Sequence, residues 1–216
     1  MRIAIMTDTN SGMTAAEARQ LGVALLPMPF TIDGQSFQEG LDLTADRFYQ
    51  ALKQGARVAT SQPSPADTTA LWDELLACHD GVVYLPMSSG LSGTCATARA
   101  LAEEEPYAGR VEVVDNGRIS ATLRQAVLDA LALRQLGLDG RTIRDALERT
   151  GAQSQIYLMV DTLKYLRQGG RITPAAALLG SALNLKPILQ LAGGKLDAYK
   201  KVRGSAAAQA ALLEAL

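Results

Sequence analysis

The chain has 216 residues, of which 48% are hydrophobic and 20% charged, and its formal net charge is −1. This length accommodates one large or two small domains with a substantial core. No apolar run reaches the roughly 20 residues of a membrane span, and no signal-peptide pattern precedes residue 3, so we expect a cytoplasmic protein.

The first 150 residues alternate predicted strands and helices, which is typical of a doubly wound α/β domain with a parallel sheet. Strands are expected at 3–6, 82–85 and 111–114, and at 23–32 with a break at Pro27 and Pro29; Asp33-Gly34 predicts a hairpin turn. Helices are expected at 14–21, 44–52, 65–78, 93–105 and 120–136. Thr44 is expected to cap the second helix, on which Ala45, Phe48, Tyr49 and Leu52 share one face. The apolar stripe of the third helix is predicted to face the core and consists of Leu71, Trp72, Leu75 and Leu76.

From residue 151 to 216 the pattern changes to that of a smaller, mixed or antiparallel α/β domain. A strand at 156–160 is followed by a short helix that Asp161 is expected to cap. A second helix is expected from Thr173 to Ala182. Strands at 187–191 and 195–202 flank Gly193-Gly194, which predicts a hairpin.

The most informative segment, LPMSSGLSGTCATA, covers residues 85–98. A buried strand ends at Pro86, and a loop rich in serine and glycine then leads into a helix. Unpaired N–H groups and the helix dipole favour an anion at such a place, and hydroxyls add donors. The hydroxyls expected to line the anion are those of Ser88, Ser89, Ser92 and Thr94, and the candidate binding set for a carboxylate is Ser89, Ser92, Gly93 and Thr94. Helix capping by Ser92 or Thr94 is the alternative interpretation.

A second hydroxyl-rich segment, TSQPSP, covers residues 60–65. Ser64 and Pro65 fit the start of a helix, but capping leaves Thr60, Ser61 and Gln62 unexplained. If both loops follow neighbouring strands of one parallel sheet, Thr60 and Ser61 would share an anionic head group with the first loop. No P-loop pattern is present, which argues against a nucleotide.

Basic residues concentrate between residues 161 and 203. This basic sector has a net charge of +6 and leaves −7 for the rest of the chain; its cations are Lys164, Arg167, Arg171, Lys186, Lys195, Lys200, Lys201 and Arg203. It indicates either an anionic partner surface or a solvated face. Nucleic acid is not expected as a partner, because aromatic residues are only 5% of the chain and do not interleave with the charges.

Five segments together resemble the DegV family of bacterial fatty-acid-binding proteins, which includes the FakB subunits of fatty acid kinase. They are GLDLTADRFYQAL (40–52), TSQPSP, LPMSSGLSGT (85–94), DTLKYLRQGGRI (161–172) and LNLKPIL (183–189). The resemblance implies two α/β domains that hold one acyl chain in an apolar tunnel. It places the carboxylate on Thr60, Ser61 and Ser92 with the neighbouring loop.

The resemblance also implies a division of labour with a separate kinase. The protein would present its fatty acid to an ATP-binding kinase subunit that forms an acyl phosphate, with no catalytic residue, metal or cofactor of its own. Arg171 and Arg203 correspond to kinase-facing positions, and contact with a membrane surface would be transient at most. Two departures stand out: Asp115-Asn116 replaces the usual Asp-Ser, and the chain stops at Leu216 before the family's late histidine, as a truncated second domain would.

Two rival functions use the same loop. A phosphate- or nucleotide-binding module would use the helix N-terminus alone. A serine-dependent acyl-transfer enzyme would use Ser92 as its nucleophile, but GLSGT lacks the Gly-x-Ser-x-Gly spacing and His79 is the only histidine. His79 and the two cysteines, Cys78 and Cys95, lack the spacing of a zinc site, so no metal is expected.

Overall fold

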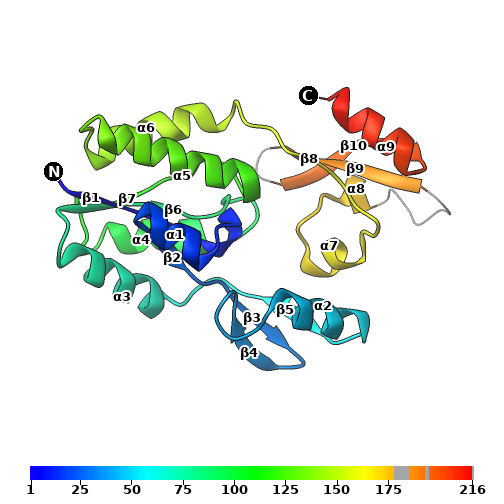
Figure 1. The fold of residues 1–216 in the computed structure, drawn as a ribbon, viewed down its shortest axis with the longest axis horizontal. Coiled ribbons are helices and arrows are strands. Elements are labelled where there is room, and N and C mark those ends of the chain that lie inside the picture. The colour runs from blue at the N-terminus through cyan, green and yellow to red at the C-terminus, as the bar shows by residue number, and fades with distance from the viewer. Residues whose placement is uncertain (178–184, 193–194, 216) are drawn as a thin grey trace. The chain divides into compact units, whose positions relative to one another are not determined.

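The computed structural model describes residues 1–177, 185–192 and 195–215. They form two compact units, Met1–Ala152 and Gln153–Leu216, which are described separately below. Helices and strands of both units are labelled in Figure 1.

A four-stranded parallel sheet is the centre of the first unit. Its order is β2-β1-β6-β7, with β1 at Ile3–Asp8, β2 at Val23–Leu26, β6 at Gly81–Leu85 and β7 at Val111–Val113. Every residue of β1 and β6 is buried, which explains why both sequences are continuous rather than alternating apolar runs. The predicted parallel α/β architecture is confirmed.

Helices cover both faces of this sheet (Figure 1). On one face, α3 (Pro65–Leu76) and α4 (Thr94–Ala102) pack against β6 and β7. On the other, α5 (Ser120–Gln135) packs against β1 and β6, and α6 (Gly140–Gly151) against β6 and β7. A short helix, α1 (Ala15–Leu21), packs against β2. The sequence analysis did not predict α6.

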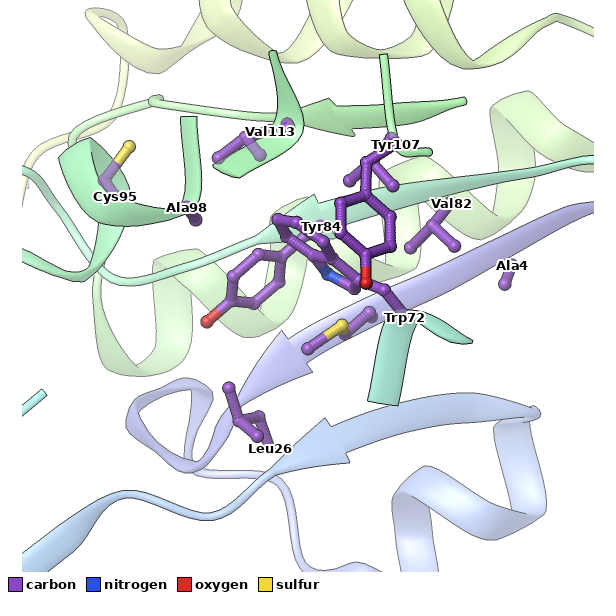
Figure 2. Close-up of a cluster of buried hydrophobic side chains, with 12 residues drawn as sticks. Ala4, Leu26, Trp72, Val82, Tyr84, Cys95, Ala98, Tyr107 and Val113 are labelled. Carbon is purple, nitrogen blue, oxygen red and sulfur yellow. The ribbon is translucent and has the colours of Figure 1, made fainter. Parts of the chain in front are cut away.

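The core under α3 and α4 is built around aromatic rings (Figure 2). Trp72 is fully buried and meets Tyr107 and Tyr84 edge to face, with ring centroids 5.2 and 6.3 Å apart. Ala4 and Met6 of β1 line the same cluster. The predicted stripe on α3 is therefore a core stripe, as expected.

A second sheet in this unit is small and antiparallel, in the order β4-β3-β5. Its strands are β3 (Pro29–Ile32), β4 (Gln35–Gln38) and β5 (Val58–Thr60). Asp33 and Gly34 have φ values of 48° and 86°, as a tight hairpin turn requires, so the predicted hairpin is confirmed. The break predicted at Pro27 and Pro29 within 23–32 is confirmed: β2 ends at Leu26, β3 begins at Pro29, and the two strands join different sheets.

The helix α2 (Ala45–Lys53) follows this small sheet and has no fully buried residue. Ala45, Phe48, Tyr49 and Leu52 were predicted to share one face of this helix. Phe48 does meet Phe30 edge to face, with ring centroids 5.4 Å apart, but the Tyr49 side is 59% exposed. This face is therefore packed at Phe48 and exposed at Tyr49.

The second unit contains an antiparallel sheet in the order β10-β9-β8, with β8 at Tyr157–Met159, β9 at Leu185–Ala192 and β10 at Lys195–Arg203. Three helices accompany it, α7 (Lys164–Gly169), α8 (Pro174–Ala177) and α9 (Ser205–Leu213). The predicted pairing of the last two strands is confirmed, while their turn at 193–194 and the predicted helix beyond Ala177 lie outside the described residues.

Asp161 does not cap a helix. Its carboxylate accepts a hydrogen bond from Lys186 Nζ at 2.5 Å, and α7 begins three residues later at Lys164. Thr162 Oγ1 accepts from the Lys164 N–H instead, because the hydroxyl lies closer to the first turn than the carboxylate.

Candidate functional site

The first hydroxyl-rich loop connects β6 to α4 at the carboxyl edge of the parallel sheet. Ser88 is buried, Ser89 and Gly93 are exposed, and Ser92 is half-buried. Gly93 is the N-cap of α4, and Thr94 is its first residue. The first N–H groups of a helix have no intrahelical acceptor, so this loop ends at a set of donors that favours an anion.

Ser92 and Thr94 form a hydroxyl pair at this helix start. Their Oγ atoms are 2.8 Å apart, and the Thr94 N–H donates to Ser92 Oγ at 3.2 Å. If the buried Thr94 hydroxyl donates to Ser92, the Ser92 O–H is left to donate outward. An anion would favour this arrangement because it supplies the missing acceptor.

The second hydroxyl-rich segment begins on β5. Thr60 ends this strand opposite Phe30, and the Ser61 N–H donates to the Pro29 carbonyl at 3.2 Å. Both side chains are exposed. The expectation that this segment follows a strand of the parallel sheet is wrong, because β5 pairs antiparallel with β3.

Gln62 nevertheless brings the two segments together. Its Nε2 donates to Thr97 Oγ1 on α4 at 3.0 Å. Gln62 Oε1 lies only 2.6 Å from the point where a Cβ on Gly93 would stand, which explains why glycine fits there. The sequence analysis left Gln62 unexplained. The one sign of its role was that it stands beside Thr60 and Ser61, which helix capping also does not explain.

Ser64, in the same segment, has a structural role. Its Oγ accepts from the Asp67 N–H at 3.0 Å and donates to the Asp67 carboxylate at 2.7 Å, which caps α3 as predicted.

Asp8 lies beneath the first loop and was missed as a site residue. It is fully buried at the end of β1, where its Oδ2 accepts from the Met87 N–H at 3.0 Å. Its Oδ1 accepts from the backbone and side-chain N–H groups of Asn10 at 2.9 and 3.0 Å. Burial raises the pKa of Asp8 from its ordinary 3.8 to about 6, although these hydrogen bonds act in the opposite direction.

Asp115 and Asn116 form the outer side of the first loop. The Ser89 N–H donates to Asp115 Oδ1 at 3.4 Å, and Asn116 Oδ1 accepts from the Arg118 N–H at 3.1 Å. The Ser88 N–H donates to the Arg118 carbonyl at 2.9 Å. These contacts fix the loop from the side that leads into α5, so Asn116 serves the local backbone.

The two arginines predicted to face a partner lie far apart on the second unit. Arg171 precedes Ile172, which bridges to Leu196 at the start of β10, whereas Arg203 ends the same strand and is exposed. Arg203 lies seven positions after Leu196 along β10, which corresponds to roughly 23 Å. A partner that touches both arginines must therefore cover the length of β10.

One open cleft of about 560 Å³ in the first unit contains none of the predicted site residues. It lies beside β7 and is lined by the ion pairs Arg99–Glu148 and Arg144–Glu112. In the described part of the chain no group of acidic, histidine or cysteine side chains could hold a metal, and no helix is long and apolar enough to cross a membrane.

Comparisons with known proteins converge on one family. Residues 2–216 match the family profile described as "Uncharacterised protein, DegV family". A DegV domain-containing protein of Deinococcus radiodurans is 40% identical over 215 residues, which cover 99% of this chain and 76% of the relative. A second from Streptomyces coelicolor is 37% identical, with 98% and 75% coverage.

Solved structures agree with these relatives. A DegV family protein from Thermus thermophilus, described by its fatty acid binding, has a TM-score of 0.89 and 35% identity, covering all of this chain and 76% of its own. A fatty-acid-binding DegV family protein from Streptococcus agalactiae has a TM-score of 0.87 and 30% identity, with 99% and 76% coverage.

Proposed function

Because this chain belongs to the DegV family, we propose that it binds one long-chain fatty acid and holds the carboxylate between its two hydroxyl-rich segments. The head-group site consists of Thr60, Ser61, Ser89, Ser92, Gly93 and Thr94. The observation that carries this proposal is the Gln62–Thr97 hydrogen bond, which puts the end of β5 next to the first turn of α4.

The site suits a carboxylate because it offers donors of several kinds. A carboxylate that leaves water needs several hydrogen bonds to offset its desolvation, and bonds to a charged acceptor are the strong ones. Here the Ser92 hydroxyl, the exposed Thr60 and Ser61 hydroxyls and the first-turn N–H groups of α4 serve as donors. The helix dipole adds attraction for the negative charge.

The acyl tail supplies most of the affinity. Each buried methylene contributes about 0.8 kcal/mol, so a tail of about sixteen carbons outweighs the cost of ordering it. We place the tail in an apolar tunnel, as the family resemblance implies.

The protein works by binding, without a cofactor, and presents the carboxylate to a separate ATP-using kinase. His79, the only histidine, follows the C-terminus of α3, where its Nδ1 contacts the Leu75 carbonyl at 2.9 Å. It is therefore engaged at a helix end rather than poised as a base for Ser92, which disfavours an acyl-transfer enzyme.

Mass spectrometry of an organic extract of the purified protein tests the proposal. We expect one fatty acid per chain. A stoichiometric phosphate or nucleotide in place of lipid would support the rival phosphate-binding function, and covalent labelling of Ser92 by a fluorophosphonate probe would support the rival enzyme.

Arginine substitutions in the second unit test the presentation step. Arg171→Ala and Arg203→Ala should leave the lipid content unchanged and slow acyl-phosphate formation by the kinase roughly two- to tenfold, because rim charges act mainly on encounter. The defect should shrink as salt rises. Lys53→Ala, which removes an exposed charge from α2, is the matched control. Loss of lipid with normal kinase coupling would reverse the assignment.

A further inference from the structure

The entrance to the first hydroxyl-rich loop is fixed by two side chains at the end of β1. Thr7 Oγ1 donates to the Leu85 carbonyl at 2.8 Å, and Asp8 Oδ2 accepts from the Met87 N–H at 3.0 Å. These bonds lie on either side of Pro86, so they set the direction in which the chain leaves β6. Ser89 follows Met87 by two residues, which keeps it within about 7 Å of Met87.

Asp8 is the charged member of this pair, and it is completely buried. Two other titratable groups, Glu39 and Tyr84, interact electrostatically with Asp8. The Glu39 carboxylate, which accepts from Thr9 Oγ1 at 2.6 Å, disfavours a second negative charge nearby. Tyr84 of β6 remains a neutral phenol, because burial raises its pKa well above the ordinary value. A negative charge on Asp8 is thus held by three N–H donors and opposed by burial and by Glu39.

We propose that Asp8 is a positioning residue that anchors the head-group loop and couples the affinity for the fatty-acid carboxylate to pH. This inference rests on the proposed function, since it needs the carboxylate at the loop. The two functions of the side chain follow from one location: it contacts the loop backbone directly, and it places an ionisable group beneath the loop that binds the anion.

The sign of the coupling follows from like charges. A bound carboxylate makes the ionisation of Asp8 less favourable, so the pKa of Asp8 rises above about 6 when fatty acid binds. By linkage, neutral Asp8 favours binding, and the affinity decreases as pH rises through this range. Two unit charges roughly 10 Å apart would change Kd about twofold at the dielectric constant of water and about fifteenfold at an effective constant of about 20.

The test compares Asp8→Asn with the wild-type protein in titrations of a long-chain fatty acid between pH 5 and pH 8. Asparagine keeps an oxygen that can accept the Met87 N–H but carries no charge. The ratio of the two Kd values removes the titration of the fatty acid itself. We expect this ratio, wild type over variant, to rise about two- to fifteenfold between pH 5 and pH 8. A merely structural role would change the affinity equally at every pH.

Glu39→Gln is the second variant. Because Glu39 is exposed, this substitution should not disturb the fold, and the test does not depend on whether Asp8→Asn folds. Without the Glu39 charge, Asp8 ionises more easily, so the midpoint of the pH dependence should move to a lower pH. The role of Asp8 would be overturned if all three proteins bind fatty acid, the ratio of Kd values is the same at every pH, and Glu39→Gln does not move the midpoint of the pH dependence. No binding by the wild-type protein at any pH would overturn the proposed function and this inference with it.

Discussion

Replacement of Ser92 by alanine is expected to weaken fatty-acid binding by about 1–3 kcal/mol, a five- to 150-fold increase in Kd. The substitution removes a hydroxyl that pairs with Thr94 Oγ1 at 2.8 Å and leaves the carboxylate one donor short. Thr60→Ala should have an effect of the same order from the other segment. Isothermal titration of delipidated protein with a long-chain fatty acid measures both.

A matched hydroxyl provides the control for these variants. Ser36 is exposed on β4, which is separated from β5 by β3 and carries no residue of the proposed site. Ser36→Ala should therefore bind fatty acid as the wild type does. Wild-type affinity in both Ser92→Ala and Thr60→Ala would contradict the placement of the head group.

Replacement of Trp72 by alanine is expected to destabilise the protein by about 3–5 kcal/mol, the usual cost of removing a buried aromatic side chain. Trp72 is fully buried and contacts the rings of Tyr84 and Tyr107, so alanine in its place leaves a cavity (Figure 2). Because it is the only tryptophan, unfolding should be followed by circular dichroism in urea rather than by fluorescence.

Two further variants bracket this prediction. Trp72→Phe should cost less, because it keeps an aromatic ring and removes an indole N–H that has no acceptor among the described residues. Leu136→Ala, at a side chain that is 77% exposed, should change the free energy of unfolding by less than about 0.5 kcal/mol. A Trp72→Ala protein as stable as Leu136→Ala would contradict the described core.

The sequence predicted the parallel sheet because β1 and β6 are buried on both faces and therefore read as uninterrupted apolar runs. It did not predict α6, whose sequence is mostly polar and buries only the narrow stripe of Gly140, Ile143, Leu147 and Gly151. Nor could it assign β5 to the small sheet, since three residues of strand carry no information about their partner. Strand pairing is decided by long-range contacts that local patterns do not record.

For the candidate site, too, the sequence showed the local patterns but not the long-range contacts. Hydroxyl-rich loops were visible in the sequence because serine, threonine and glycine exceed what capping needs there. The contacts that join them were not, because Gln62 meets Thr97 35 residues away and Asp8 meets Met87 79 residues away. A buried carboxylate at a strand end looks like any turn residue until its partners are known.

Amide chemical shifts in a ¹⁵N-labelled protein would test most directly where the head group binds. Addition of a long-chain fatty acid should shift the N–H resonances of Ser61, Ser89 and Ser92 and of the first turn of α4. The alcohol of equal chain length should shift them much less, because it lacks the negative charge that these donors bind. Saturable binding of the fatty acid that leaves these resonances in place, or shifts them no more than the alcohol does, would contradict a carboxylate site between the two hydroxyl-rich segments.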